Sequence, residues 1–417
     1  MIKDLDKKMR AYALKNALAY NGKANSGSVI SALFNEGLKK EEVKDVIGKV
    51  NSLVKEVNSL SLEEQQKEYV KLHEIISERH GREGLPELPG AKKGKVVLRF
   101  APSPSGPFHI GHAATACISY LFVKEYGGKF YVRIEDTNPE NIYPQAYKMI
   151  EDESKWLFDG IAKVIIQSDR MKIYYDLAVK LISKRSAYVC TCTQDAFKNH
   201  VDGKSECPCR DLGVDENMKR WKKMLSKRSS QVRSTSSKLG QSEGYKEGEA
   251  VVRFKSSMTH KNPAMRDFPL ARINLTEHPR QKKKYRVWPL MNLAVAADDI
   301  KQGMTHIIRA KDHRDNAERQ KMIYESLGLG KKFPWTAFLG RIHFKDLELS
   351  TTQFRKGIEE KKYSGWDDKK LPTIASLKKQ GYKPQAFWKF AERVGLSEND
   401  KTFDKAEYFR LLNDFNR

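Results

Sequence analysis

The chain has 417 residues and a formal net charge of +24, from 77 lysines and arginines against 53 aspartates and glutamates. This length suits two to four domains, and the charge favours a polyanionic partner, nucleic acid before membrane, although a lysine-rich proteome would give the same excess. No apolar run approaches the roughly 20 residues of a membrane span, the first ten residues are polar and charged, and the five cysteines do not resemble a secreted disulfide framework. We expect a soluble, cytoplasmic protein with no membrane partner.

Residues 1–93 are predicted to form an N-terminal helical module. Apolar residues at helical spacing predict two helices, the second capped by Ser26 or Ser28. The residues on these faces are Ala11, Leu14, Ala17 and Leu18, then Val29, Ile30, Leu33 and Phe34. Ser61 and Glu64 have the S-x-x-E spacing of a capping box, which predicts a third helix running toward His80. A segment rich in proline and glycine, residues 84–95, leads into the body of the chain.

The central stretch of the chain is a predicted strand, residues 95–100, followed by a loop and a predicted helix, residues 113–126. The loop is rich in proline, serine and glycine, and it ends in His109-Ile110-Gly111-His112. Such a turn often holds phosphate, because free backbone N–H groups and the helix dipole point at one spot. Two imidazoles there can donate further hydrogen bonds to phosphate oxygens. A capped turn with incidental histidines is the alternative interpretation.

The next elements predict an α/β fold with a parallel sheet. A strand at residues 130–134 follows the first after about thirty residues, which is the length of a βαβ unit. Glu135 and Asp136 end this strand, and ligands of such sheets bind at that edge. A helix at 145–158, a strand at 163–167 and a helix at 174–184 continue the alternation.

Four cysteines in two close pairs predict a metal site. Cys190, Cys192, Cys207 and Cys209 form a C-x-C…C-x-C set, and thiolate is a preferred ligand of Zn²⁺. Four protein ligands leave no open position, so we expect a structural ion. The spacing is one residue shorter than the usual C-x2-C, and unpaired reduced thiols are the alternative. The fifth cysteine, Cys117, lies inside the predicted helix and is expected in the core.

The second half of the chain begins with a segment rich in serine, lysine and arginine, residues 226–242, which is expected to be a disordered basic loop or a tolerated insertion. Strands are predicted at 249–255, 268–274 and 305–309, and helices at 315–327, 374–380 and 385–394. An apolar run at 288–297 ends in Asp298 and Asp299.

Together these motifs resemble the class I glutamyl-tRNA synthetases of the archaeal type, a branch that also includes glutaminyl-tRNA synthetases. The matching segments, in family order, are residues 99–106, 109–112, 133–137, 188–190, 286–289, 298–299, 349–351 and 365–368. The resemblance implies a Rossmann catalytic domain in two halves, 94–186 and 285–340. It also implies an acceptor-stem-binding α+β insertion at 187–284, with the possible zinc site, and a helical stem-contact region at 341–417. The N-terminal module, residues 1–93, would contact tRNA or another partner.

The resemblance further implies a glutamate–tRNA ligase reaction in two steps. Glutamate attacks the α-phosphorus of ATP, with Mg²⁺, and the glutamyl group then passes to the terminal ribose 2′-hydroxyl of tRNA(Glu). The implied catalytic residues are His109, His112 and Ser350. The implied ATP site comprises Pro102, Ser103, Pro104, Ser105, Gly106, Pro107, His109, Gly111, His112, Ser350 and Thr351. The implied amino-acid site comprises Arg99, Ser103, Glu135, Met291 and Arg309.

Residue chemistry agrees with the assigned amino-acid site. The planar fork of Arg99 matches two carboxylate oxygens, and Glu135 has the charge that a substrate ammonium requires. Structural ion pairing is the alternative for Arg99 and for Arg309.

Some positions depart from the family pattern. Met291 stands where relatives usually carry tyrosine, Ala114 where they often have arginine, and Asn138 where aspartate is commoner. Residues 349–352 lack the lysine of the family's KMSKS loop, and Arg355 and Lys356 are candidates to replace its charge. Relatives continue into β-barrels that read the anticodon, so a fragment, a split gene with a separate barrel chain, or a truncated paralogue is expected. A tRNA-binding protein without activity, a glutamine-charging enzyme, and an enzyme that glutamylates another acceptor are the alternative functions.

Overall fold

The structure, a computed structural model, describes residues 4–76, 84–227 and 244–417. It contains two compact units, residues 1–83 and 84–417, which are treated separately below. The predicted basic loop at 226–242 lies almost entirely outside the described residues. Within the described ranges, none of the helices has the length and apolar character needed to cross a membrane.

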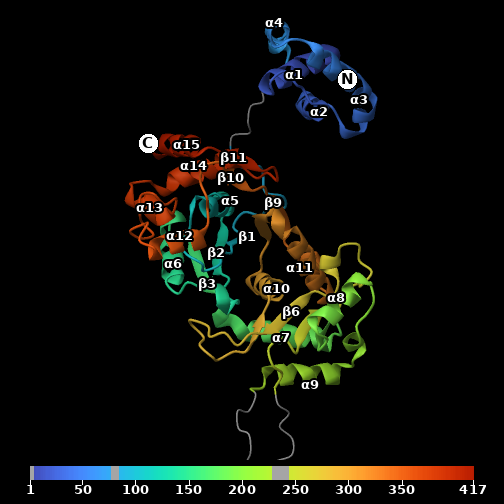
Figure 1. The fold of residues 1–417 in the computed structure, drawn as a ribbon, viewed down its shortest axis with the longest axis vertical. Helices are drawn as coiled ribbons and strands as arrows, with labels where there is room; N and C mark the ends of the chain where they lie inside the picture. Colours follow the sequence, from blue (N-terminus) through green and yellow to red (C-terminus); the bar gives the residue numbers. More distant parts are fainter. Residues whose placement is uncertain (1–3, 77–83, 228–243) are drawn as a thin grey trace, which may run out of the picture. The chain divides into compact units, whose positions relative to one another are not determined.

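The first unit is helical, as predicted, and it contains one helix more than the sequence patterns indicated (Figure 1). Its α-helices are α1 (Leu5–Ala19), α2 (Ser26–Leu33), α3 (Val43–Ser59) and α4 (Leu62–Leu72), with short 3-10 turns at Phe34–Glu36, Lys40–Glu42 and His73–Ile75. The capping box of Ser61 and Glu64 is confirmed. The predicted serine cap of α2 is wrong, because the Asn25 side chain accepts the N–H groups of Gly27 and Ser28. The helix predicted to run toward His80 ends at Leu72.

The second unit is built around parallel strands, which confirms the predicted α/β class. Strands β1 (Val96–Phe100), β2 (Gly128–Ile134) and β3 (Ala162–Ile166) pair in parallel in the order β1-β2-β3. Strands β8 (His306–Ala310) and β9 (Trp335–Leu339) form a second parallel pair. This pair lies beside β1, because the N–H of Thr305 donates to the carbonyl of Val97 over 3.1 Å. Helices α5 (Ile110–Tyr126), α6 (Ala146–Leu157) and α11 (Arg314–Ser326) connect these strands, and α10 (Met291–Gln302) leads into β8.

An antiparallel sheet interrupts the parallel one, and Figure 1 shows its helices α7, α8 and α9 in green beside it. Its strands pair in the order β4-β5-β6-β7. They are β4 (Ala187–Cys190), β5 (Val251–Phe254), β6 (Pro269–Ile273) and β7 (Val287–Pro289), and the neighbouring helices are α7 (Met171–Ser183), α8 (Gln194–Asp202) and α9 (Val214–Leu225). The sheet begins where the insertion was predicted to begin. It ends at Pro289, beyond the predicted boundary at 284, because β7 still pairs with β6.

The last part of the chain packs on the same core as the parallel sheet. It comprises β10 (Ile342–Phe344), α12 (Thr351–Glu359), α13 (Ile374–Lys379), α14 (Pro384–Val394), β11 (Lys401–Phe403) and α15 (Lys405–Asn416). Phe387 and Phe390 of α14 are buried in one cluster with Phe122 of α5 and Phe158. The segment before β1 belongs to this unit too, because Leu88 is buried in the cluster and His306 hydrogen-bonds the carbonyl of Pro89. The unit therefore starts at Gly84, earlier than the predicted boundary at 93.

Candidate active site

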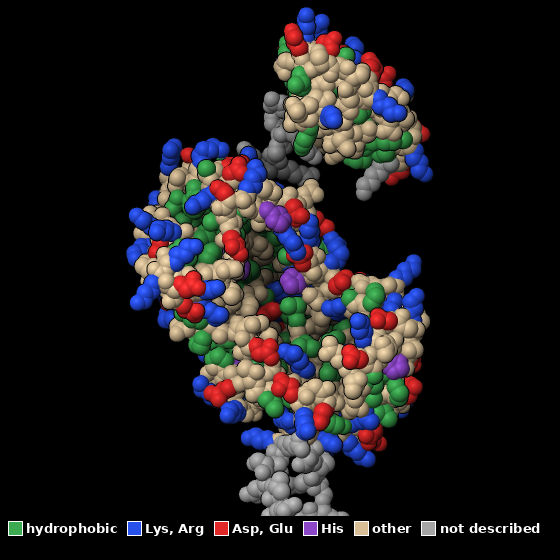
Figure 2. Space-filling model, viewed as in Figure 1, with side chains coloured by type: hydrophobic (Ala, Val, Ile, Leu, Met, Phe, Trp, Pro, Cys, Tyr) green, Lys and Arg blue, Asp and Glu red, His purple; other side chains and the backbone are tan. Residues whose placement is uncertain are grey.

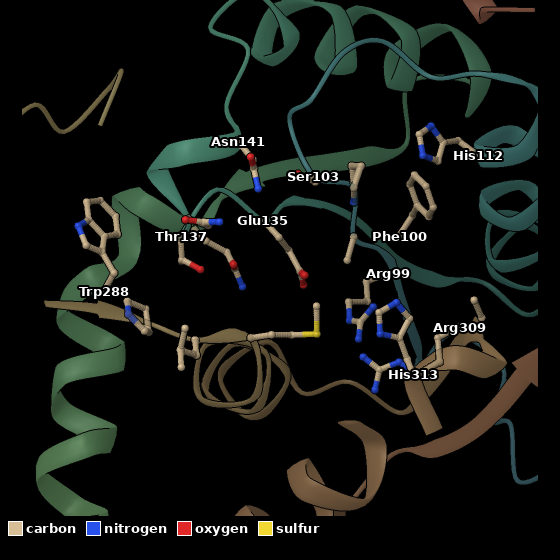
Figure 3. Close-up of a pocket in the computed structure, with 18 of the residues that line it drawn as sticks. Arg99, Phe100, Ser103, His112, Glu135, Thr137, Asn141, Trp288, Arg309 and His313 are labelled. Carbon is tan, nitrogen blue, oxygen red and sulfur yellow. The ribbon is translucent and has the colours of Figure 1, made fainter. Parts of the chain in front are cut away.

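A cavity of about 660 Å³ opens at the carboxyl ends of β1, β2 and β8. On the face drawn in Figure 2 the second unit is hollowed, and histidine side chains lie at the edge of the hollow. Figure 3 shows Arg99, Arg309 and His313 on one side of the pocket, Thr137, Asn141 and Trp288 on the other, and Glu135 between them. Loop ends of parallel strands thus bring together residues that are far apart in sequence, as the sheet topology predicts.

Arg99 lies at the end of β1 with part of its guanidinium uncommitted. The residue is 4% exposed, and its Nε donates to Oδ1 of Asp299 over 3.1 Å. Its Nη2 is buried and has no hydrogen-bond partner among the described residues. A buried donor without a partner is costly unless a ligand supplies one. The alternative of structural ion pairing therefore accounts for only half of the arrangement: one nitrogen is anchored in a buried ion pair and another is open to an acceptor.

The anchor is a buried charge network at the end of α10. Asp299 also accepts from Nη1 of Arg133 over 2.5 Å. Burial alone would raise the pKa of Asp299, but the charges of Arg99 and Arg133 outweigh it, and the pKa is lowered. The neighbouring Asp298 accepts from Arg170 and from the hydroxyl of Tyr174. The Asp-Asp motif found in the sequence is thus a support beneath the cavity.

Glu135 extends this network into the cavity. Arg133 donates to its Oε1 over 3.2 Å through Nη2. The other carboxylate oxygen, Oε2, has no hydrogen-bond partner within the described ranges, and the residue lines the cavity. A cation that enters the cavity can therefore pair with Glu135 without displacing Arg133.

Arg309, at the end of β8, lies on the same side of the cavity as Arg99 (Figure 3). Its Nη1 donates to Oε1 of Gln320 over 2.9 Å, while its buried Nε has no partner in the described part of the chain. Burial, together with the charge of Arg99, lowers the pKa of Arg309 to about 10. Two guanidiniums with open nitrogens form a site that favours an anion.

His109 and His112 cap the helix that follows the loop. Nδ1 of His109 accepts from the N–H groups of Gly111 and His112 over 3.1 and 3.4 Å, and Nδ1 of His112 accepts from the N–H of His109 over 3.5 Å. The rings are stacked with centroids 3.7 Å apart. Burial lowers the pKa of His112 to about 4, and burial with the charge of its neighbour lowers that of His109. Both imidazoles are thus neutral, and their protons reside on Nε2.

This geometry corrects one sequence prediction. Free N–H groups at the helix start were expected to hold phosphate, but the first four are engaged. Those of Gly111 and His112 bond His109, that of Ala113 bonds the carbonyl of His109, and that of Ile110 bonds the carbonyl of Pro372. At the start of α5, the donors left for a phosphate are the Nε2–H groups of the two histidines. Of the pair, His112 lines the cavity and His109 does not.

The loop between β1 and α5 packs on the start of α12. The hydroxyls of Ser105 and Thr351 are 3.0 Å apart, and Gly106 has no room for a side chain, since a Cβ there would lie 3.0 Å from Trp366 and 3.2 Å from Thr351. Ser350 caps α12 by accepting the N–H of Gln353. Of the predicted nucleotide-binding residues, Pro102, Ser103 and His112 line the cavity, whereas Pro104, Ser105, Gly106, Pro107, His109, Gly111, Ser350 and Thr351 do not.

All five predicted amino-acid-binding residues line the cavity: Arg99, Ser103, Glu135, Met291 and Arg309. Sequence reasoning assigned no role to His313 and Trp288, which also line it. The Nε1 of Trp288 is buried without a partner among the described residues. Trp288 lies in the segment 286–289 that matches the family, and His313 closely follows the predicted strand at 305–309. These positions are the signal from which both residues could have been predicted.

The four cysteines lie together, as predicted. The Sγ atoms of Cys190, Cys192, Cys207 and Cys209 are all within 4.8 Å of one another, and three of the four residues are buried. Two of the separations are 3.9 Å (Cys190 to Cys207) and 4.0 Å (Cys192 to Cys209). The N–H of Thr191 donates to Sγ of Cys209 over 3.4 Å.

Comparisons with known proteins match nearly the whole chain. The sequence pattern of the family described as "tRNA synthetases class I (E and Q), catalytic domain" matches residues 95–414. The glutamate–tRNA ligase of Methanocaldococcus jannaschii is 41% identical over 400 residues, which are 96% of this chain and 68% of that protein. The glutamate–tRNA ligase of Thermococcus kodakarensis is 43% identical over 94% of this chain and 67% of its own length.

A solved structure has a similar fold. It is that of a glutamate tRNA ligase from Elizabethkingia meningosepticum in complex with its amino acid, with a TM-score of 0.52 and 20% identity. The match covers 76% of this chain and 68% of that one.

Proposed function

The chain belongs to the class I tRNA synthetases for glutamate and glutamine, and we propose that it is a glutamate–tRNA ligase. Glutamate would be activated with ATP, as its Mg²⁺ complex, and then transferred to the 3′ end of tRNA(Glu). The observation that carries the proposal is the pair of guanidiniums at one side of the cavity, each with an open nitrogen: Nη2 of Arg99 and Nε of Arg309.

The arrangement of charges suits glutamate bound by its side chain. The open guanidinium N–H groups donate to the γ-carboxylate, because fork-shaped donors match two carboxylate oxygens. Oε2 of Glu135 then pairs with the α-ammonium. The α-carboxylate, which carries the chemistry, is left free to face the nucleotide. Glutamine offers an amide in place of the second oxygen, so it would leave a buried donor of the pair unmatched.

In the first step an α-carboxylate oxygen bonds to the α-phosphorus of ATP, and the bond to the bridging oxygen of pyrophosphate breaks. Neutral imidazoles that donate through Nε2 stabilise charge on the phosphate oxygens without carrying a proton away. In the second step the 2′-hydroxyl of tRNA attacks the activated carbonyl, loses its proton, and AMP leaves. His109 and His112 are the residues we assign to the first step, with Ser103 and Ser105 at the loop.

The tRNA would lie against the second unit. Residues 84–417 carry 62 lysines and arginines against 40 acidic residues, whereas residues 1–83 are nearly balanced at 15 against 13. Association with a polyanion is therefore favoured by the unit that holds the cavity. Within it we assign the antiparallel sheet and its helices to the acceptor stem and residues 341–417 to further stem contacts.

We further infer that the four-cysteine cluster holds a structural Zn²⁺. Four thiolates at the Zn–S distance of about 2.3 Å and tetrahedral angles lie about 3.8 Å apart. The 3.9 and 4.0 Å separations fit that geometry, and the N–H of Thr191 donates to a sulfur as it would to a thiolate. Metal analysis of the purified protein tests this inference, with one zinc per chain expected and none in Cys207→Ser/Cys209→Ser. A wild-type protein purified without chelator and free of zinc would contradict it.

The proposed function is tested by ATP–pyrophosphate exchange with glutamate, with and without tRNA, followed by aminoacylation with labelled glutamate. We expect exchange with glutamate and a labelled tRNA product. The same assay with glutamine distinguishes the glutamine-charging alternative, for which we expect exchange at least about 100-fold weaker. Absence of exchange under every condition, with tRNA still bound, would instead establish a tRNA-binding protein without activity.

A further inference from the structure

Glu153 is a buried carboxyl group behind the histidine loop, and the proposed reaction assigns it no role. It lies on α6 and is 7% exposed. Its Oε2 accepts the backbone N–H of Phe108 over 2.6 Å, and its Oε1 is buried with no hydrogen-bond partner among the described residues. Burial raises the pKa of Glu153 to about 8, against the opposing effects of the nearby N–H groups of Phe108 and Ala375.

Phe108, which Glu153 holds, is the residue that sets the position of the histidines. Its carbonyl accepts the N–H of Ile374 over 2.8 Å, so both polar groups of its backbone are fixed. Its buried ring contacts Phe100 and His112 edge-on, with centroids 5.5 and 6.0 Å apart. Phe100 and His112 both line the cavity.

The clamp on this segment has parts from two other regions of the chain. Glu153 comes from α6, and residues 372–375 come from the last part of the chain, where the carbonyl of Pro372 also accepts the N–H of Ile110 over 3.0 Å. Glu153 is the only side chain among these contacts, because the others are backbone to backbone. A substitution at Glu153 therefore removes one point of the clamp and leaves the others in place.

We propose that Glu153 is a positioning residue, which holds the Phe108 peptide so that His109 and His112 present their Nε2–H groups to the nucleotide. The proposal rests on the proposed function, since it concerns the same site. A merely structural role is the competing explanation. A buried carboxyl is a costly way to fill space, and a structural role predicts a loss of stability on replacement, because the buried N–H of Phe108 loses its acceptor, with no selective change in KM for ATP. The two explanations therefore predict different effects on substrate binding.

The test compares Glu153→Leu, Glu153→Gln and the wild type in ATP–pyrophosphate exchange, with KM measured separately for ATP and glutamate. Leucine fills the space without accepting the N–H of Phe108, and we expect KM for ATP to rise about tenfold while KM for glutamate stays within about twofold. Glutamine keeps an acceptor oxygen, and we expect it to restore KM for ATP to within about twofold of the wild type. Asp152→Asn is the matched control, because Asp152 is the exposed neighbour that pairs with Lys148 on the same helix.

Each outcome decides the matter. An unchanged KM for ATP in Glu153→Leu, or a loss in Glu153→Gln as large as that in the leucine variant, would overturn the proposal. If Glu153→Leu does not fold, Glu153→Asp replaces it. Its shorter side chain cannot reach the N–H of Phe108 from the same backbone position. We again expect KM for ATP to rise while KM for glutamate stays unchanged. Absence of exchange in both the wild type and Asp152→Asn would instead count against the proposed function.

Discussion

The arginine pair, Arg99 and Arg309, and the histidine pair, His109 and His112, are held in opposite ways. The arginines are charged and rest on buried partners, Asp299 for one and Gln320 for the other, with further nitrogens left open. The histidines are neutral and hold each other through their Nδ1 atoms at the start of α5. Both arrangements fix a side chain on one side and leave donors free on the other.

The two arrangements suit two different anions in one cavity, a carboxylate and a phosphate. A carboxylate that must stay bound and unreacted is bound by guanidinium groups, which are permanently charged and have a rigid, fork-shaped set of donors. A phosphate whose charge changes during reaction is matched by neutral donors that cannot lose their role by titration near pH 7. The experiments below test this division of roles, from the largest expected effect to the smallest.

Arg99→Ala should cause the greatest loss. It removes the open Nη2 and leaves Asp299 with one cationic partner fewer, so kcat/KM for glutamate in exchange should fall at least about 1,000-fold. Arg99→Lys keeps the charge without the fork and should still lose about 100-fold. Arg393→Ala, at an exposed arginine of α14, is the control. A loss below about tenfold for Arg99→Ala would remove the arginine pair from the site.

His109→Asn and His109→Ala separate the cap from the donor. Asparagine is a favoured N-cap, so His109→Asn should keep the stability of the wild type, whereas alanine should cost about 1 kcal/mol. Both lack Nε2–H and should lose about 100-fold in kcat for exchange. Thermal unfolding and exchange rates, measured on both variants, give the comparison. If asparagine restored activity along with stability, the histidine would be a cap and nothing more.

Asp299→Asn tests the support of the arginine pair. The amide keeps the shape of the carboxylate but not its charge, so Arg99 loses its anionic partner, while Arg133 keeps Glu135 and Asp298. We expect a loss of about 3 kcal/mol in the free energy of unfolding and a rise of about tenfold in KM for glutamate, with KM for ATP unchanged. Urea unfolding and the two KM values check this. An equal rise in both KM values would show that Asp299 supports the whole cavity.

The neutrality of the histidine pair predicts a small pH effect on stability. The pKa of His112 is about 4 in the folded protein, against about 6.5 in an unfolded chain. Between these values only the unfolded imidazole binds a proton, so this group costs stability as pH falls from 6.5 to 4 and has no effect above 6.5. His112→Gln has no such proton. The difference in Tm between wild type and variant should therefore shift by roughly 2–4 °C between pH 7.5 and 4.5, in favour of the variant at low pH. A difference independent of pH would contradict the neutral assignment.

The sequence predicted the elements whose signals are local. The parallel strands, the capping box at Ser61 and the gathering of the four cysteines followed from periodicity and spacing. Helix α3 was overlooked although Val46, Val50, Val54 and Val57 form its buried face at helical spacing, so that signal was present. The cap of α2 was assigned to Ser26 or Ser28, one or three residues late, because asparagine and serine have similar capping preferences.

The features of the site that could not be predicted from the sequence depend on contacts between residues that are far apart in the chain. The pairing of Arg99 with Asp299 and the hold of Glu153 on Phe108 join positions with no shared local pattern. The engaged N–H groups of α5 follow from the choice of a histidine as N-cap and from Pro372, far along the chain.

The antiparallel sheet that separates the two halves of the parallel one has a consequence for synthesis on the ribosome. Arg99 and its partner Asp299 are 200 residues apart. At 5–20 residues per second, Arg99 is made roughly 10–40 s before its counter-ion exists. During that interval β1, β2 and β3 hold two arginines that the finished protein buries, with no carboxylate of α10 to receive them. The nascent half therefore carries two charged groups without their buried partner until α10 is made, and its core is completed only later, when α14 packs on α5.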